Sequence, residues 1–298
     1  MSDGNVTPFW TYEDQLSWPG RKCTEGGYLQ SPIDIQTENV PMDYENKFIK
    51  YGELQFIGYQ RVLLTAVHNG HTIQFSCEGD KDMHPRMTGG PLMNMYRLEQ
   101  VHFHWLSEHT IDGNKFPMEI HLVHVRSDLT VKDALKTPDG LAIIAIFCKV
   151  KVDLSLDLDG LVHDMMNYIP KLKQRGDRMS GILLDLKNLV PANSKSYYTY
   201  AGSLTSPECN EVVIWILMET PIYVTEYQYD EITKAAVRRH NTRHLQPISR
   251  HKIYRPFVRE SFMPQTPYIF KAVGETLEYF YNFFGNVTKA YRIYKQLK

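Results

Sequence analysis

The segment VHFHWLSEHTIDGNKFPMEIHLVHV, residues 101–125, holds five of the twelve histidines in the chain. On a β-strand, side chains two residues apart point to the same face of the sheet. His102 and His104 therefore share one face of a first strand. In the second strand, MEIHLVHV, His121 and His124 are three residues apart and point to opposite faces. The segment thus predicts two neighbouring strands from which three histidines can converge on one point.

Three converging histidines suggest a metal site. Three neutral imidazoles with a fourth position open are a ligand set of catalytic zinc. The step of 17 residues from His104 to His121 leaves room for a connecting loop and the return of the chain. Strand alternation alone also produces H-x-H pairs, and a single strand histidine is usually an ordinary polar residue. Spacing alone therefore leaves a metal site and a structural role both open.

Short apolar runs bounded by turn residues predict the rest of the fold. They include RVLLTAV, HTIQFSC, GLAIIAIFCKV and EVVIWILM, which begin at residues 61, 71, 140 and 211. The last two are almost continuously apolar, which is typical of central strands buried on both faces. Helical spacing occurs at residues 158–172 and 231–240. The expected fold class is α+β and mainly β, with a large, mostly antiparallel twisted sheet and short peripheral helices.

Composition restricts the class of protein. The 298 residues are 43% hydrophobic and 22% charged, which is typical of a globular protein, and the formal net charge is −1. A charge so close to zero argues against nucleic acid or an anionic membrane as a partner. No apolar run is long enough to predict a transmembrane helix. One domain is expected over residues 9–260, followed by an aromatic-rich, partly helical C-terminal extension at residues 261–298.

The N-terminus and the cysteines bear on location. The first residues contain no basic stretch followed by an apolar one, unlike a signal peptide, and so favour a cytoplasmic location. The four cysteines are Cys23, Cys77, Cys148 and Cys209. They form no CxxC pair, which argues against a cysteine zinc site. Composition favours buried apolar cysteines and leaves a bridge between any two of them open.

The histidine segment resembles the zinc-binding core of the α-class carbonic anhydrases, and the resemblance covers residues 9–258. It is carried, in the family's order, by QSPIDI (30–35), NGH (69–71), YRLEQVHFHW (96–105), SEHT (107–110), MEIHLVHV (118–125), DGLAIIAIF (139–147), GSLTSPEC (202–209), EVVIWI (211–216) and NTRHLQP (241–247). It implies the fold of that family, one Zn²⁺ per chain, and the reversible hydration of carbon dioxide to bicarbonate and a proton. Carbon dioxide and bicarbonate are then the small-molecule partners, and a monomer is the default state.

The resemblance assigns the metal ligands residue by residue. His102, His104 and His121 match the three zinc ligands, whereas His109 and His124 match none and are interpreted as structural. The groups that match the hydrogen-bond acceptors of the three ligand rings are Gln100, Glu119 and the backbone carbonyl of Asn241. Such acceptors fix the tautomer and orientation of a ligand imidazole.

The resemblance also assigns catalytic roles. Thr205 matches the residue whose hydroxyl accepts a hydrogen bond from the attacking zinc hydroxide, and Glu108 matches the carboxylate that accepts from that hydroxyl. An ionised carboxylate can only accept, so the direction of this relay is fixed. His71 in NGH matches the proton shuttle, and an imidazole with a pKa of about 6.5 suits proton transfer at neutral pH. The residues that match the groups ordering the shuttle water are Tyr12, Asn69 and Gln74. His68 is interpreted as a surface residue, with an auxiliary shuttle as the alternative.

Carbon dioxide is apolar and requires an apolar wall beside the metal. The residues that match the substrate pocket are Val123, Ile143, Leu204, Ser206, Val213 and Trp215. By pattern alone, ordinary sheet core accounts for the apolar members equally well. Ile143 stands where family members often have valine, which narrows the pocket, and Ser206 replaces a frequent threonine.

Two departures from the family pattern leave questions to the tertiary structure. A single residue, Leu106, separates Trp105 from Ser107, where many relatives carry several residues, and this affects the reach of Glu108. Cys23 and Cys209 match the cysteines that form a disulfide in secreted and membrane-anchored relatives. A secreted location is therefore the alternative to a cytoplasmic one.

Two other functions compete with carbon dioxide hydration. The first is a carbonic-anhydrase-related binding protein with weak turnover, although such relatives typically lack one or more of the zinc histidines. The second is a zinc hydrolase of another class, which the absence of HExxH and of a carboxylate zinc ligand disfavours.

Overall fold

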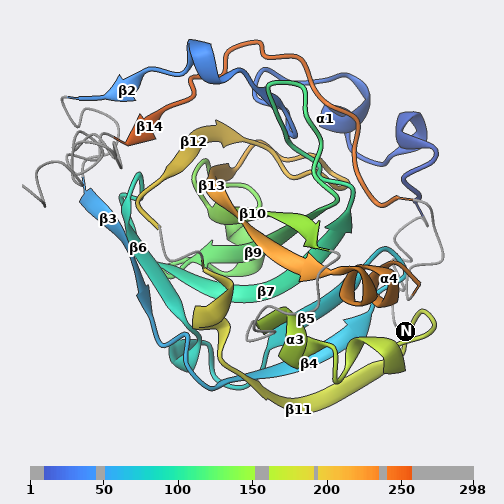
Figure 1. Ribbon diagram of the computed structural model, residues 1–298. Helices are drawn as coiled ribbons and strands as arrows, with labels where there is room; N and C mark the ends of the chain where they lie inside the picture. Colours follow the sequence, from blue (N-terminus) through green and yellow to red (C-terminus); the bar gives the residue numbers. More distant parts are fainter. Residues whose placement is uncertain (1–9, 45–50, 152–160, 191–193, 235–239, 257–298) are drawn as a thin grey trace, which may run out of the picture. The chain divides into compact units, whose positions relative to one another are not determined.

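The structure is a computed structural model that describes residues 10–44, 51–151, 161–190, 194–234 and 240–256 (Figure 1). The chain divides into two compact units, residues 1–257 and 258–298. Every described residue belongs to the first unit. The predicted C-terminal extension at 261–298 therefore lies outside the described residues.

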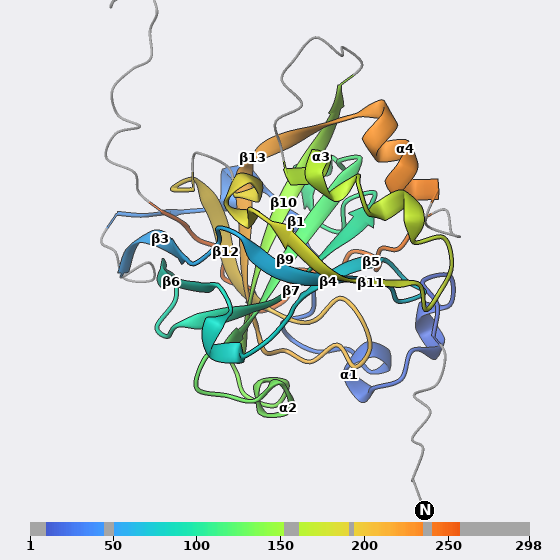
Figure 2. The same ribbon diagram turned by 90° about the horizontal axis from the view of Figure 1, so that it is seen from below.

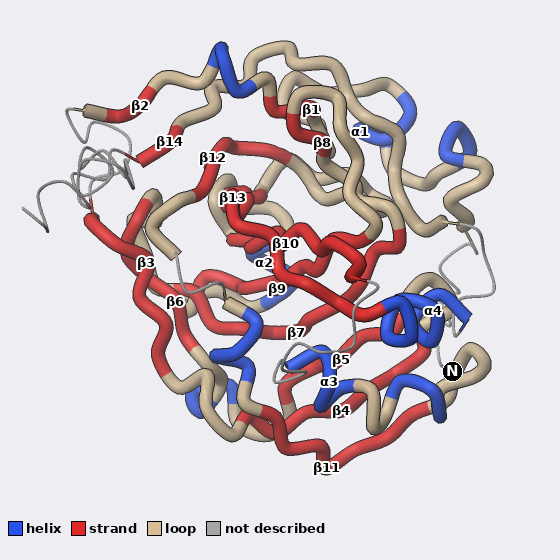
Figure 3. Tube along the Cα trace, in the orientation of Figure 1, coloured by secondary structure: helices blue, strands red, loops and turns tan. Residues whose placement is uncertain are grey.

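A ten-stranded mixed sheet dominates the described part of the chain, and Figure 3 shows how few residues are helical. Its strands are β3 (Tyr51–Ile57), β4 (Val62–His68), β5 (Ile73–Cys77), β6 (Arg86–Gly90), β7 (Tyr96–Trp105), β9 (Met118–Arg126), β10 (Leu141–Lys151), β11 (Arg178–Leu184), β12 (Tyr197–Gly202) and β13 (Val213–Thr225). The order is β11-β4-β5-β7-β9-β10-β13-β12, and β6 joins β3 to β7. All neighbours are antiparallel except β10 and β13, which run parallel. The predicted mainly β fold class is thereby confirmed.

Small elements surround the sheet. The two-stranded sheets pair β1 (Asp34–Ile35) with β8 (Thr110–Ile111) and β14 (Arg255–Pro256) with β2 (Met42–Asp43). The helices are η1 (Gln15–Ser17), α1 (Arg21–Thr24), η2 (Thr37–Asn39), η3 (Lys81–Met83), α2 (Val131–Ala134), α3 (Leu161–Met165), η4 (Ile169–Lys171), η5 (Leu186–Leu189) and α4 (Glu226–Lys234). Figure 2 shows α1 and α2 on one side of the unit and α3 and α4 on the other. Among the described residues, none of these helices is long and apolar enough to cross a bilayer.

The predicted strand runs all form strands, but the helices differ from their predicted limits. The run expected at 158–172 contains α3 and then the separate turn η4, which has a proline in its first turn and so lacks one backbone donor. The helix expected at 231–240 begins earlier, at Glu226. Thr225 and Gln228 form a capping box there: Gln228 N donates to Thr225 Oγ1 (3.1 Å) and Thr225 N to Gln228 Oε1 (2.9 Å).

Strand alternation divides the core between the two faces of the sheet. Along β10, Ala142, Ile144, Ile146 and Cys148 pack into one apolar cluster, and Leu141, Ile143, Ala145 and Phe147 pack into the other. Both clusters are buried, so the strand is apolar at nearly every position, as its sequence predicts. The same alternation sends Phe103 of β7 and Leu122 of β9 into the first cluster. The histidines of β7 and His121 consequently face the other side.

Candidate metal centre

Three imidazoles from two adjacent strands converge on one point. β7 and β9 pair so that His102 lies opposite His121. His102 Nε2 lies 3.0 Å from His104 Nε2 and 3.3 Å from His121 Nδ1. All three rings are largely buried, and His104 and His121 are 2% and 1% exposed. The site therefore brings together the three histidines that the family resemblance assigns as ligands.

The outer hydrogen bonds of the rings determine which nitrogens carry protons. His102 Nδ1 donates to Gln100 Oε1 (2.9 Å), and His104 Nδ1 donates to the carbonyl oxygen of Asn241 (2.7 Å). His121 Nε2 donates to Glu119 Oε1 (2.7 Å). Since a neutral imidazole has one N–H, the three nitrogens that face one another all present lone pairs. They cannot hydrogen-bond to one another, and a cation between them would remove their repulsion.

The donor set fits zinc. Zn–N bonds of about 2.0–2.1 Å in a tetrahedral site separate ligand nitrogens by roughly 3.3 Å, close to the 3.0 and 3.3 Å found here. The pKa values of His102 and His104 are lowered, chiefly by burial, which keeps the rings neutral as metal ligands must be. The fully buried carboxylate of Glu119 also lies beside the rings, hydrogen-bonded to His121. A buried carboxylate requires compensating partners, and a divalent cation would add one.

Glu119 of β9 joins His121 to the buried side chain of His109. Its Oε1 accepts from His121 and also from His109 Nδ1 (2.7 Å), and its Oε2 accepts from the backbone N–H of His109 (2.9 Å). Burial acts to raise the pKa of Glu119, but His109 and His121 outweigh it and hold that pKa well below its usual value. His109 is itself held by Tyr200, whose hydroxyl lies 2.7 Å from Nε2. His109 therefore orients Glu119.

His124 lies on the opposite face of β9. The ring is fully buried, and burial lowers its pKa to about 4, so it is neutral. His124 Nδ1 donates to the carbonyl of Ala142 (3.2 Å), and Nε2 accepts from the hydroxyl of Tyr59 (2.5 Å). Both ring nitrogens thus have partners away from the centre formed by His121.

Glu108 and Thr205 are both buried, but no hydrogen bond joins their side chains. Glu108 Oε1 accepts from the backbone N–H of Arg243 (2.9 Å), and Oε2 lies 3.5 Å from His104 Nε2. Oε2 has no hydrogen-bond partner among the described residues, so the expected bond from the Thr205 hydroxyl is not formed. The short turn before Glu108 places Leu106 at φ 65°, a left-handed conformation, and Leu106 side chain is exposed.

Gln30 and Arg243 connect the segment that follows Asn241 to the loop that carries Thr205. No role was predicted for either residue. The buried Arg243 guanidinium donates from its Nη1 to Gln30 Oε1 (2.9 Å) and to the carbonyl of Ser31 (2.8 Å). Gln30 Nε2 in turn donates to the carbonyl of Cys209 (3.1 Å), in the loop that carries Thr205. Both residues lie in irregular segments with no periodic pattern, so only their positions in QSPIDI and NTRHLQP could have indicated them.

The predicted shuttle residues gather at the turn between β4 and β5. Asn69 Oδ1 accepts from the backbone N–H of His71 (2.9 Å), and Asn69 Nδ2 donates to Gln74 Oε1 (3.3 Å). The His71 ring stacks on Trp10, with centroids 3.8 Å apart, and lies 6.3 Å from the ring of Tyr12. The stacking role of Trp10 was not predicted.

The interpretation of His68 as a surface residue is wrong. The side chain is 3% exposed, and its Nδ1 accepts from the backbone N–H of Gly70 (3.1 Å). His68 is the last residue of β4 and pairs with Ile73 of β5, so it belongs to the sheet and not to the turn that follows.

The residues that match the substrate wall come together across three strands. Ile143 pairs with Val123 on one side and with Trp215 on the other, and Val213 pairs with Leu141. Val123 and Leu204 pack against the same buried cluster, and the rings of Trp215 and His121 lie 5.0 Å apart. Ser206 is partly buried in the loop beyond Leu204.

A disulfide joins Cys23 to Cys209, with a Cα–Cα distance of 5.3 Å. Both cysteines belong to a small cluster with Tyr12, Trp18 and Trp10. The bridge therefore ties the N-terminal segment, which contacts His71, to the loop that carries Thr205. Cys77 and Cys148 are free.

Comparison with known proteins identifies the family. The model of the eukaryotic-type carbonic anhydrases matches residues 13–257. Carbonic anhydrase 6 of Homo sapiens is 29% identical over 91% of both chains. Carbonic anhydrase 1 of Monodelphis domestica and the mitochondrial carbonic anhydrase 5A of Homo sapiens are each 32% identical, and they cover 83% and 86% of this chain and 98% and 83% of their own. The chain belongs to the eukaryotic-type carbonic anhydrase family.

Proposed function

We propose that this protein is a zinc enzyme that interconverts carbon dioxide and bicarbonate. The observation that supports it is the arrangement of three ring nitrogens. Each faces the others with a lone pair, because the N–H of its ring makes a hydrogen bond on the far side. His102, His104 and His121 would hold the metal. Zinc, when bound, is a Lewis acid that makes hydroxide available near neutral pH.

The remaining chemistry belongs to the chain. The wall of Val123, Ile143 and Trp215 would offer carbon dioxide an apolar surface. The Thr205 hydroxyl would donate a hydrogen bond to Glu108, which can only accept. Its oxygen would then accept a hydrogen bond from the nucleophile and so orient it. This requires the Thr205 hydroxyl to come within hydrogen-bond distance of Glu108 Oε2, a contact that is not formed here. His71, half-buried and stacked on Trp10, would carry the proton to solvent.

Carbon dioxide hydration measured by stopped flow tests the proposal, together with metal analysis. We expect about one zinc per chain, turnover well above the uncatalysed rate, and inhibition by a primary sulfonamide. A protein that contains zinc but does not hydrate carbon dioxide would reject the proposed reaction while leaving the metal site intact.

The open contact at Glu108 favours one alternative, a catalytically weak relative that retains the metal. If the Thr205 hydroxyl does not reach Glu108 Oε2, the nucleophile loses its orientation and turnover falls although zinc binds. Thr205→Val separates the cases, because it removes the hydroxyl and keeps the shape. A large loss of kcat/KM supports a closed contact during catalysis, and an unchanged kcat/KM supports the weak relative.

His71→Ala should slow proton transfer. We expect kcat at high carbon dioxide to fall about 10²-fold, the lower end of general acid–base contributions, while kcat/KM remains near its original value. Added imidazole buffer should restore kcat, because it replaces the missing proton carrier. His244→Ala, at an exposed position, is the control and should change neither parameter. Failure of imidazole to restore kcat would remove His71 from this role.

The disulfide supports the secreted location over the cytoplasmic one. Disulfides form and persist in oxidising compartments and are rare where thiols are kept reduced. The Cys23–Cys209 bridge would be stable in the first setting.

A further inference from the structure

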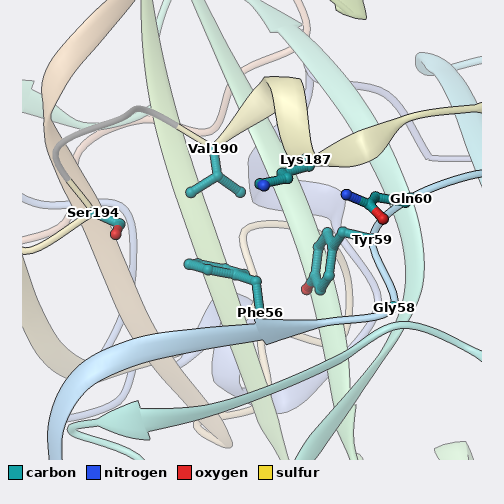
Figure 4. Close-up of a pocket in the computed structure, with 7 residues that line it drawn as sticks. All are labelled: Phe56, Gly58, Tyr59, Gln60, Lys187, Val190 and Ser194. Carbon is teal, nitrogen blue, oxygen red and sulfur yellow. The ribbon is translucent and has the colours of Figure 1, made fainter.

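A cavity of about 450 Å³ lies between η5 and the connection from β3 to β4 (Figure 4). Its lining residues are Phe56, Gly58, Tyr59, Gln60, Lys187, Val190 and Ser194. Figure 4 shows Val190 and Lys187 facing Phe56 and Tyr59 across the cavity, with Ser194 at one end and Gln60 at the other. The volume falls within the range of about 300–1,000 Å³ that is typical of small-molecule sites.

This cavity is separate from the metal centre. Tyr59 is 2% exposed, and its hydroxyl donates to His124, on the face of β9 opposite His121. Tyr59 and Phe56 belong to or pack against the apolar cluster that contains Leu122, whereas the substrate wall belongs to the other cluster. The sheet therefore lies between the two sites, and a ligand in one does not touch the residues of the other.

The floor of the cavity is fixed and aromatic. The rings of Phe56 and Tyr59 form an edge-to-face pair, with centroids 5.3 Å apart and planes at 88°. The hydrogen bond from the Tyr59 hydroxyl to His124 directs the polar atom of that ring away from the cavity, so the ring contributes apolar surface. Val190 supplies apolar surface from the opposite wall. A flat apolar ring between these walls would contact carbon on both faces.

The polar groups of the described lining residues lie at the rim. Among these residues Lys187 alone is charged, and its ammonium makes no ion pair with another described residue. Its backbone is held in η5, because its N–H donates to Asp185 Oδ1 (3.1 Å) at the start of that turn. The amide of Gln60 and the hydroxyl of Ser194 can each donate a further hydrogen bond. The ammonium, the amide and the hydroxyl can therefore all donate hydrogen bonds to an anionic group.

We propose that this cavity binds a small aromatic carboxylate, with its ring between Val190 and Phe56 and its carboxylate on Lys187. A cation is disfavoured because the charge that the described lining residues contribute is positive. The proposal does not depend on the proposed reaction, since none of the lining residues belongs to the metal centre.

The test uses 2-naphthoate as the probe and the full chain, with the metal centre blocked by a primary sulfonamide. We expect binding in the millimolar range, with intermolecular NOEs from the probe ring to the Val190 methyls and the Phe56 ring. Lys187→Gln should weaken binding about fivefold, the upper value for an exposed charge pair. Lys187→Glu should weaken it further and favour 2-naphthylmethylamine, which carries the opposite charge on the same ring. Lys132→Glu in α2 makes the same charge change away from the cavity and should have no effect.

Three results would overturn the proposal. Binding that disappears when the sulfonamide is present places the probe at the metal centre. Binding unchanged by Lys187→Glu shows that the ammonium does not hold the carboxylate. No NOE to Val190 or Phe56 at saturating probe shows that the cavity is not the site. None of these results bears on carbon dioxide hydration, which is measured separately.

Discussion

His121→Ala is expected to abolish zinc binding, and with it carbon dioxide hydration, while the protein remains folded. His121 Nδ1 is one of the three lone pairs that face the centre, and its loss leaves only the two histidines of β7. Two imidazoles are too few for a stable four-coordinate site. Metal analysis after dialysis should show zinc falling from about one per chain to near zero, and stopped-flow hydration should fall to the uncatalysed rate.

His124→Ala is the matched control. His124 lies on the same strand and is equally buried, but it faces the other side of the sheet. The substitution leaves the Tyr59 hydroxyl and the Ala142 carbonyl without their partner, at a cost of about 1–3 kcal/mol of unfolding free energy. Zinc content should nevertheless remain at one per chain. Zinc retained in His121→Ala and lost in His124→Ala would show that strand parity selects the wrong histidine.

Removal of the disulfide is expected to have the largest effect on stability. The Cys23→Ser, Cys209→Ser double variant should lose about 2–5 kcal/mol of unfolding free energy. The bridge spans 186 residues, so it restricts the unfolded chain strongly. It also anchors the cluster of Tyr12, Trp18 and Trp10, and the last of these stacks on His71. Guanidinium unfolding monitored by tryptophan fluorescence measures the loss.

Thiol titration provides the companion measurement. The native protein, denatured without reductant, should show two free thiols, Cys77 and Cys148, and four after reduction. Cys77→Ser is the control for stability, because Cys77 is free and only partly buried. Four thiols without reductant would show that the bridge is absent, and would return the location to the cytoplasmic alternative. If the double variant and Cys77→Ser had the same free energy of unfolding, the bridge would contribute nothing to stability.

The role of Tyr59 could not be predicted from the sequence. Its place in the chain gives no signal, because a tyrosine beside a turn is ordinary. In the structure, its ring lines the cavity beside η5 and its hydroxyl donates a hydrogen bond to His124. Contacts of this kind join positions 65 residues apart, and no local pattern encodes them. Trp10, Gln30 and Arg243 escaped prediction for the same reason, since each acts through a distant segment.

The pattern of apolar and polar residues is enough to predict the strands and the faces of their side chains. Alternation is a property of the extended backbone, so it separated His121 from His124 and identified β10 as buried on both sides without knowledge of the fold. Tertiary packing sets how separate segments meet. It buried His68, joined Cys23 to Cys209 and left Glu108 Oε2 without the Thr205 hydroxyl. These contacts depend on loop conformations, above all the turn at Leu106, which are set by packing between distant parts of the chain and have no periodicity to reveal them.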